Sequence, residues 1–308
     1  MTEKQKGHLA MFVSTIIFAL NIPVAKSLLT VWHSPLGLTG MRIVFAAAMF
    51  WLVSLFIKKE KVTGKDMILL IFGSFFGMAF NQMSFISGLS MTSPIDASII
   101  ATTTPMIVML ISAAVLKEPI TVKKTLGVII GAAGAILIVV SQTHNSLNPT
   151  SWIGNLLVLV SSSMYAVYLV ITKKITQRYH PVTLLKWMFL FAAIFVLPFT
   201  YSEIMTFPLL HVYNPDVAIR IFYILFMATF ISYFLIPISL KRIRPTSVGS
   251  YNYLQPLIAS FAAIAVGQDT LTIEKPIAAI LVFSGVYLVT ISKSRADLEK
   301  ENSDKHRK

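Results

Sequence analysis

Two related stretches decide the fold, residues 94–141 (PIDASIIATTTPMIVMLISAAVLKEPITVKKTLGVIIGAAGAILIVVS) and residues 245–292 (PTSVGSYNYLQPLIASFAAIAVGQDTLTIEKPIAAILVFSGVYLVTIS). They align without a gap at an offset of 151 residues. The matching positions carry proline, acid, threonine, lysine and glycine: Pro94 with Pro245, Pro105 with Pro256, Glu118 with Asp269, Thr121 with Thr272, Lys124 with Lys275, and Gly134 with Gly285. Leucine, isoleucine and valine match by chance between apolar helices, but these residue types do not. The pattern therefore indicates the duplication of one unit.

The composition is that of a membrane protein. Of 308 residues, 56% are hydrophobic and only 13% are charged, against about 45–50% and about 25% in soluble proteins. This argues against a soluble enzyme and a disordered protein, and no nucleic-acid partner is expected. The chain has no cysteine, so a disulfide, a thiolate nucleophile or a cysteine metal site is excluded.

Ten segments have the length and apolarity that a helix needs to cross a bilayer, which is about 20 residues. They run roughly over 9–30, 36–57, 66–88, 94–116, 123–141, 152–172, 184–201, 217–240, 246–267 and 277–292. Short connections leave no room for an extramembrane domain. The first segment is too long for the apolar core of a signal peptide and lacks an A-x-A cleavage site. The predicted fold class is an all-α polytopic membrane protein with ten transmembrane helices.

Basic residues concentrate in alternate connections, which predicts the orientation. They lie in both chain ends and in the connections 58–65, 117–124, 173–178 and 241–244, whereas among the intervening connections only Lys275 is basic. Cytoplasmic loops carry the excess of lysine and arginine. The net charge of +13 then needs no polyanionic partner. We expect a multi-pass protein of the cell (inner) membrane with cytoplasmic N- and C-termini, and with the lipid bilayer as a partner.

The repeat predicts two inverted halves. Residues 1–146 form a first five-span repeat, residues 147–297 a second, and residues 298–308 a basic cytoplasmic tail. An odd number of spans makes the second repeat enter the membrane from the opposite side. Inverted repeats recur in secondary transporters, which bind substrate near the bilayer midplane between the repeats. Two halves that exchange slightly different shapes would also exchange the side on which the cavity opens.

The chain resembles the EamA-like families of the drug/metabolite transporter superfamily over roughly residues 8–293. The resemblance is carried by Phe18 to Pro23 with Lys26, by Arg42 and the following Ile-Val-Phe-Ala, by Thr104-Pro105, Glu118, Gly127 and Gly134, and by Gln255-Pro256, Asp269 and Gly285. It implies two five-span repeats and transport of amino acids, nucleotide-like metabolites, sugars or toxic compounds. Asp269-Thr270 departs from the usual Glu-x, and the sixth and seventh spans match poorly, which leaves the cargo open.

Two prolines are predicted to break the fourth and ninth spans at matching places. Pro105 and Pro256 lack an amide hydrogen and clash with the carbonyls of Ala101 and Asn252, four residues earlier. Inside a membrane, carbonyls released in this way are tolerated where they face protein or a water-filled cavity. We expect both to be gating kinks that face a cavity, although a simple packing kink is the alternative.

Polar and aromatic residues at depth predict a substrate pocket, since such groups are costly in lipid and face the bundle interior. Gln82 and Tyr233 are equivalent at the 151-residue offset, and Asn252 and Gln255 share a helix face, as do Tyr165 and Tyr168. The predicted substrate-binding residues are Phe18, Asn21, Arg42, Gln82, Phe85, Thr104, Tyr168, Tyr233, Tyr251, Asn252 and Gln255. The alternative is that these groups only join helix to helix through hydrogen bonds.

Three charged residues near the spans are assigned mainly structural roles. Arg42 is expected to pair either with Asp96, at the same outer end, or with an anionic group of a substrate. Lys26 lies one turn from the outer surface and is expected to extend its amine to water, as long basic side chains do. Glu118 precedes Pro119 and is expected to end the fourth span beside nearby lysines.

Several functions lack the residues that they need. No aspartate or glutamate lies near the middle of any predicted span, and the six histidines lie at span ends or in loops. A buried carboxylate relay and a metal centre are therefore not expected, and no cofactor is predicted. The sequence has no phosphate-binding loop of the ATP-driven kind. We expect a secondary transporter of a small-molecule substrate with an unknown coupling ion, and not an enzyme. A lipid flippase, or a channel or receptor without alternating access, are the alternatives.

Overall fold

The apolar segments form helices in a computed structural model, which describes all residues except 93, 117–119, 141–150, 208–213, 266–272 and 292–308. No strand occurs in the described residues. The first half contains α1 (Glu3–Leu29), α2 (Pro35–Ser54), α3 (Gly64–Ser74), η1 (Phe75–Ala79), α4 (Phe80–Met91), α5 (Pro94–Ile100), η2 (Ala101–Thr103), α6 (Thr104–Leu116) and α7 (Val122–Val140). The second half contains α8 (Ser151–Thr172), η4 (Ile175–Gln177), α9 (Pro181–Ile204), α10 (Pro215–Phe222), η6 (Tyr223–Ile231), α11 (Ser232–Arg242), α12 (Pro245–Ser250), η7 (Tyr251–Leu254), α13 (Gln255–Ala265) and α14 (Glu274–Thr290).

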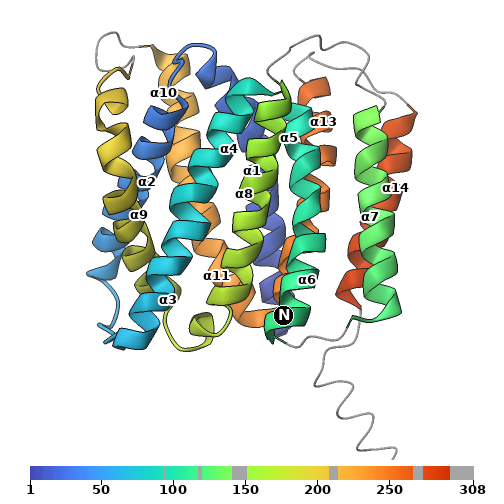
Figure 1. Ribbon diagram of the computed structural model, residues 1–308, viewed down its shortest axis with the longest axis horizontal. Helices are drawn as coiled ribbons and strands as arrows, with labels where there is room; N and C mark the ends of the chain where they lie inside the picture. Colours follow the sequence, from blue (N-terminus) through green and yellow to red (C-terminus); the bar gives the residue numbers. More distant parts are fainter. Residues whose placement is uncertain (93, 117–119, 141–150, 208–213, 266–272, 292–308) are drawn as a thin grey trace, which may run out of the picture.

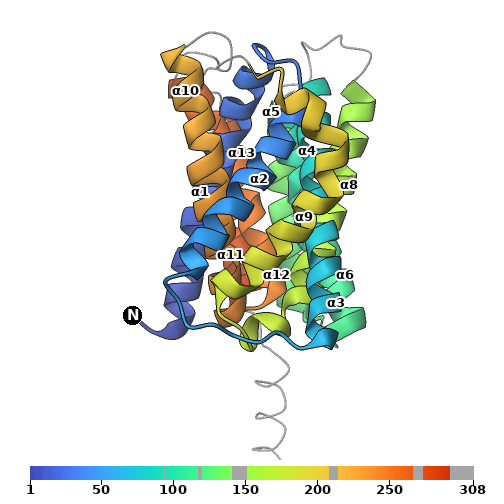
Figure 2. The ribbon, with the colours of Figure 1, turned by 90° about the vertical axis from the view of Figure 1, so that its left-hand side faces the viewer.

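The helices stand side by side as an upright bundle in both views (Figure 1, Figure 2). The chain begins at the lower end of this bundle, which we call the N-terminal end, and α14 descends to the same end (Figure 1). Within the described residues, six helical segments are long and apolar enough to cross a membrane: Glu3–Leu29, Pro35–Ser54, Gly64–Met91, Trp152–Thr172, Pro181–Ile204 and Pro215–Arg242. The other four predicted spans coincide with α5 to α6, α7, α12 to α13 and α14. A polytopic all-helical membrane protein is thus confirmed, and the number of ten crossings stays a prediction.

Irregular turns interrupt the third and fourth spans of each half at matching positions. The π-helical turn η1 maps at the 151-residue offset into the π-helical segment η6, and the 3₁₀ turn η2 maps into η7. The flanking boundaries also match, since α6 begins at Thr104 and α13 at Gln255. Such irregular turns within helices often accompany functional sites or hinges. Both predicted kinks lie there, because Pro105 and Pro256 directly follow the first residues of α6 and α13.

The helices pair across the two halves. Helix α1 packs along α11, and α8 packs along α4. In both pairs, the first predicted span of one half packs on the third predicted span of the other half. Helix α2 packs on α9, and α7 packs on α14. Glycines allow close approach, since a Cβ atom built on Gly88 would lie 2.7 Å from the carbonyl oxygen of Gly154, and one built on Gly154 would lie 2.8 Å from that of Gly88. Small residues serve this purpose in membrane bundles, where water does not drive helices together.

A polar cluster joins α3 to the segment after α8 at the N-terminal end of the bundle. The carboxylate of Asp66 accepts hydrogen bonds from Arg178 Nη1 at 2.8 and 3.1 Å and from the Tyr179 hydroxyl at 2.8 Å. The Asp66 side chain is 3% exposed, whereas that of Arg178 is 60% exposed. The carboxylate is therefore the member of the cluster that is screened from water, and its loss would leave the buried Tyr179 hydroxyl without its acceptor.

We expect Asp66→Ala to lower the free energy of unfolding by about 1–3 kcal/mol, the cost of leaving a buried polar group unsatisfied. The matched control is Asp216→Ala, because Asp216 pairs with Arg220 four residues along the same helix while its side chain is 63% exposed. Exposed pairs of this kind contribute about 0.3–0.5 kcal/mol. Apparent melting temperatures in detergent measure both. Equal shifts for the two variants would contradict the cluster as described.

Candidate functional site

A cavity lies at the centre of the bundle, where the first, second, third, fourth, sixth, eighth and ninth predicted spans meet. Its volume is about 90 Å³, several times the roughly 10–15 Å³ that one water molecule needs. The lining residues are Phe18, Asn21, Ile22, Arg42, Asn81, Gln82, Phe85, Ala101, Thr104, Ser161, Ser162, Tyr165, Tyr233, Asn252 and Gln255. Aromatic walls with a few placed amides are typical of a site for a small organic molecule.

The structure brings together nine of the eleven predicted pocket residues. These are Phe18, Asn21, Arg42, Gln82, Phe85, Thr104, Tyr233, Asn252 and Gln255. Three pairs among the lining residues are equivalent at the 151-residue offset: Gln82 with Tyr233, Ala101 with Asn252, and Thr104 with Gln255. Both halves therefore supply the same positions to one cavity, although with different side chains.

Tyr168, although predicted in the pocket, is not among the residues that line this cavity. Its side chain is 1% exposed and packs on η1, where a Cβ atom built on Gly77 would lie 2.5 Å from the Tyr168 ring. The cavity position belongs to Tyr165 instead, whose ring centroid is 5.8 Å from that of Tyr168. Residues three apart share a helix face only approximately, so one of the two faces the cavity while the other fills the space beside a glycine.

Tyr251 is also outside the cavity, because its turn is not α-helical. Tyr251 is one of the predicted pocket residues and directly precedes Asn252 in the ninth span. In the 3₁₀ turn η7, side chains three residues apart project on the same side of the helix, so Asn252 and Gln255 project together. Tyr251 points elsewhere, and its hydroxyl lies 3.0 Å from His8 Nδ1 near the N-terminal end of α1.

Several lining residues were missed by the sequence analysis. Asn81, Ser161 and Ser162 are polar and lie at mid-span, so they carry the same sequence signal as Gln82. Asn81 Nδ2 donates to the carbonyl oxygen of Ser161 at 2.8 Å and to its hydroxyl at 2.9 Å, which joins α4 to α8. Ile22 and Ala101 are apolar and carry no signal of their own.

Polar atoms on the cavity wall lack protein partners. Among the described residues, Asn21 Oδ1 and the Tyr165 hydroxyl are buried without a hydrogen bond, and the Gln82 carboxamide, which lies beside the Tyr233 hydroxyl, makes none of ordinary geometry. Asn21 and Gln82 are each 2% exposed. Buried polar groups are nearly always hydrogen-bonded, and each exception needs an explanation. For polar groups that line a cavity, a bound molecule can supply the missing hydrogen-bond partners.

Arg42 reaches the cavity from α2. It is 3% exposed, and its Nε donates to Thr229 Oγ1 of η6 at 2.9 Å. The carboxylates of the described ion pairs are Glu3, Asp66 and Asp216, and none of them pairs with Arg42. The side chain of Asp96 lies outside the described residues, so the expected Arg42–Asp96 pair stays a prediction. Glu118 likewise lies outside the described residues.

Lys26 uses its amine to cap a helix end, which the sequence did not predict. Its Nζ donates to the carbonyl oxygens of Leu89 at 2.9 Å, Ser90 at 3.0 Å and Thr92 at 2.8 Å. These carbonyls end α4, where the last four carbonyls of a helix have no partner within it. The cation therefore caps a neighbouring helix, because the helix end offers three acceptors at the negative pole of its dipole.

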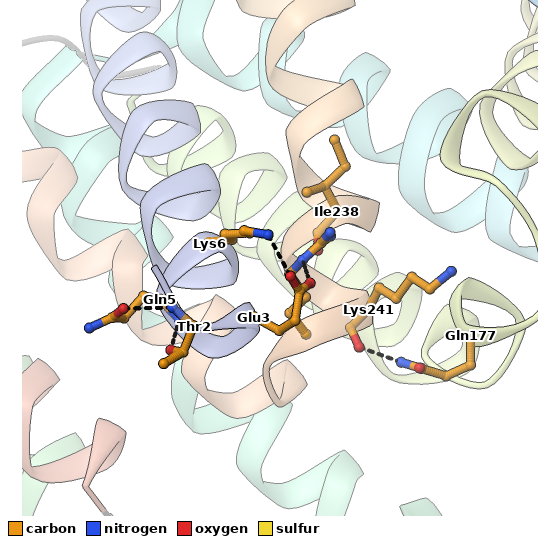
Figure 3. Close-up of polar contacts among 8 residues, drawn as sticks. Thr2, Glu3, Gln5, Lys6, Gln177, Ile238 and Lys241 are labelled. Carbon is orange, nitrogen blue, oxygen red and sulfur yellow. Dashed lines mark hydrogen bonds and ion pairs between the residues drawn. The ribbon is translucent and has the colours of Figure 1, made fainter.

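The equivalent helix end carries an equivalent cap at the opposite end of the bundle. The carbonyls that match at the 151-residue offset are those of Leu240, Lys241 and Ile243 at the end of α11. Lys173 Nζ donates to Leu240 and, at 2.7 Å, to Ile243. Gln177, the position equivalent to Lys26, donates to Lys241 at 2.7 Å (Figure 3). Nearby, Glu3 accepts from Lys6 at 2.6 Å (Figure 3) and from Arg242 Nε at 2.9 Å.

The described residues contain no group of three or more histidine, cysteine, aspartate or glutamate side chains that would hold a metal ion. The geometry offers no nucleophile and general base at the cavity within the residues that line it. A helical bundle with a small polar cavity at its centre is compatible with a membrane transporter. The comparisons with known proteins agree with this class.

The chain belongs to the EamA-like transporter family, whose model matches residues 5–140 and 152–291. The resemblance to the drug/metabolite transporter superfamily is thereby confirmed. An uncharacterized transporter of Archaeoglobus fulgidus is 28% identical over 202 residues, 66% of this chain and 68% of that one. The uncharacterized transporter YetK of Bacillus subtilis is 22% identical over 305 residues, 96% of this chain and 91% of that one. A solved crystal structure with 18% identity and a TM-score of 0.74 covers 93% of this chain and 97% of its own, and shows the same fold.

Proposed function

We propose that the protein is a secondary transporter that moves small organic metabolites, amino acids or related amphipathic compounds, across the cell membrane by alternating access. The observation that carries the proposal is the cavity, which is lined by both halves and holds buried polar atoms without protein partners. A bound solute supplies those partners. The family membership gives the class of activity, and the cavity is the site that we propose for it.

Two inverted repeats, residues 1–146 and 147–297, are the proposed basis of the mechanism. The matching irregular turns, the exchanged helix pairs and the two matching helix ends that lysines cap support this division. If each half can adopt the shape of the other, the cavity opens in turn to either side of the membrane. Pro105 and Pro256 are proposed as gating kinks, because they adjoin the cavity residues Thr104 and Gln255. We place both termini in the cytoplasm, from the basic connections, and the protein in the inner membrane.

The test is solute flux into proteoliposomes. Liposomes that contain the protein and are preloaded with an unlabelled amino acid are expected to accumulate the same amino acid, in labelled form, by counterflow. The rate of uptake is expected to saturate with the external concentration. Counterflow requires a site that is loaded on both sides in turn, so a channel does not produce it. If no amino acid or organic acid that is tested shows counterflow, and the protein gives single-channel conductance in a planar bilayer, the protein is a channel and the proposal is wrong. Redistribution of a labelled lipid without solute flux would replace it by a flippase.

Substitution of the cavity amides is expected to reduce that flux. Asn252→Ala and Gln82→Ala each remove a carboxamide from the cavity wall. The loss of one neutral hydrogen bond, about 0.5–1.5 kcal/mol, corresponds to a reduction of flux at low solute concentration of roughly two- to tenfold. Gln5→Ala is the matched control, because Gln5 carries the same carboxamide at the exposed start of α1. Wild-type flux in both cavity variants, with equal amounts of folded protein, would contradict the assignment.

A further inference from the structure

The guanidinium of Arg42 is a buried charge without a counter-charge among the described residues. It stays protonated at any pH that the protein meets. The ion pairs of the described residues lie in or beside the end turns of helices, at Glu3, Asp66 and Asp216, and the described cavity wall holds no carboxylate. An unpaired cation inside a membrane-spanning bundle is costly and marks a functional group by default. Here the charge faces a cavity, so a partner that enters and leaves can reach it.

Thr229 holds this guanidinium in a defined orientation. The Thr229 hydroxyl donates its single hydrogen to the carbonyl oxygen of Ile224 at 2.8 Å, five residues earlier in the π-helical segment η6. Its oxygen is therefore kept as an acceptor for Arg42 Nε. The two terminal nitrogens, Nη1 and Nη2, donate to no described residue. Their parallel hydrogens form the pair of donors that matches two oxygens of a carboxylate or a phosphoryl group.

The groups around Arg42 complete a site for a small solute that is anionic at one end. Asn21 presents a buried amide oxygen without a hydrogen bond, Gln82 a buried carboxamide that makes none of ordinary geometry, and Tyr165 its hydroxyl. These groups donate and accept hydrogen bonds but carry no charge. The described cavity wall is therefore positive when empty, and it offers neutral acceptors for an ammonium or hydroxyl group of the same solute.

We infer that Arg42 is the anion-binding group of the cavity, and that the cargo carries a carboxylate or a phosphoryl group which the two terminal guanidinium nitrogens hold. This inference rests on the proposed function, because it takes the cavity to be the substrate site. It goes further in naming the chemistry of the cargo. Arg42 then works as a substrate ligand, and Thr229 as the residue that positions it.

The decisive test supplies the anion within the protein itself. Gln82→Glu introduces a carboxylate into the cavity wall, where Gln82 and Arg42 both neighbour Tyr233. We compare apparent melting temperatures of four proteins in detergent at pH 8: wild type, Gln82→Glu, Arg42→Gln and the double variant. The carboxylate is expected to stabilise the protein, or leave it unchanged, when Arg42 is present, and to destabilise it in the Arg42→Gln background. We expect the two effects to differ by about 4 °C or more. Equal effects in the two backgrounds would overturn the inference.

A ligand panel then identifies the anion. The probes are single amino acids and succinate, each with its methyl ester, and inorganic phosphate, scored by thermal stabilisation of wild type and Arg42→Gln. Stabilisation by an acid and not by its ester names a carboxylate, and stabilisation by phosphate names a phosphoryl group. We expect Arg42→Gln to weaken either by about 10- to 100-fold, as for the loss of hydrogen bonds to a charged group. Stabilisation by the esters alone, unchanged in Arg42→Gln, overturns the inference.

The two proposals fail in different ways. Flux of an uncharged solute at wild-type rate through Arg42→Gln would overturn the anion site and keep the transporter. Coupling between Gln82→Glu and Arg42→Gln, without flux of any panel member, would keep the anion site and overturn the transporter. If no probe stabilises the protein, the four-protein comparison alone decides.

Discussion

Gly285→Ala is expected to prevent α14 from packing on α7 and to lower the free energy of unfolding by about 3 kcal/mol or more, at or above the upper end of the usual cost of overpacking. A Cβ atom built on Gly285 would lie 2.5 Å from the carbonyl oxygen of Gly127, and 2.6 and 2.7 Å from the amide nitrogen and Cα of Gly131. All three are backbone atoms, so no change of side-chain rotamer relieves the clash. The helices must separate, and the small-residue contact between them is lost.

The measurement is the yield of monodisperse protein in size-exclusion chromatography, with the apparent melting temperature of what remains. The matched control is Gly64→Ala, because a Cβ atom built on Gly64 meets no atom within 4 Å. Alanine favours the helix more than glycine does, so we expect this control to be neutral or slightly stabilising. A Gly285→Ala protein as stable as the control would show that α7 and α14 do not approach as closely as described.

Lys26→Met is expected to destabilise the protein by about 3 kcal/mol, the upper value for hydrogen bonds to a charged group. Methionine keeps most of the side-chain volume but donates nothing to the three carbonyls that end α4. These carbonyls also lose the cation that complements the helix dipole. Water reaches the helix end only in part, because the Lys26 contacts are half-buried.

The control for this substitution is Lys65→Met. Lys65 is exposed in the first turn of α3 and has no described partner, so the same chemical change is expected to shift the apparent melting temperature little. Lys26→Arg retains a charge and several donors, and is expected to recover part of the stability. Similar stability for Lys26→Met and Lys65→Met would show that the cap contributes nothing.

The sequence predicted the helical membrane fold because hydropathy and segment length directly reflect the bilayer. It predicted most of the cavity as well, since polar residues such as Gln82 and Asn252 at mid-span have few other uses. It failed where local helix geometry decides which way a side chain points. Tyr251 was misplaced because no sequence signal announced the 3₁₀ turn η7, and Tyr168 because the space beside Gly77 is visible only once η1 and α8 are packed.

Charged residues were the hardest to predict, because their partners are distant in sequence and include backbone atoms. Lys26 was expected to reach water, because hydropathy describes a single segment and cannot report a contact with three carbonyls more than sixty residues away. The polar hydrogen-bond partner of Arg42, Thr229, is 187 residues distant. Sequence periodicity places a residue on a face of its own helix, but the identity of the facing helix comes only from the assembled bundle.

The buried guanidinium of Arg42 has a consequence for the response of the protein to voltage. With a monoanion bound, the site is electrically neutral, and without it the site carries one positive charge. A full elementary charge crossing the membrane field experiences about 2.3 kcal/mol per 100 mV, and a charge that crosses part of the field experiences that fraction. If the protein alternates access as proposed, the electric field in a cell with a negative interior acts mainly on the unloaded form and favours the state in which Arg42 faces inward. The membrane potential then biases the empty site toward the inward-facing state. The change of the loaded form between the two states depends little on the potential.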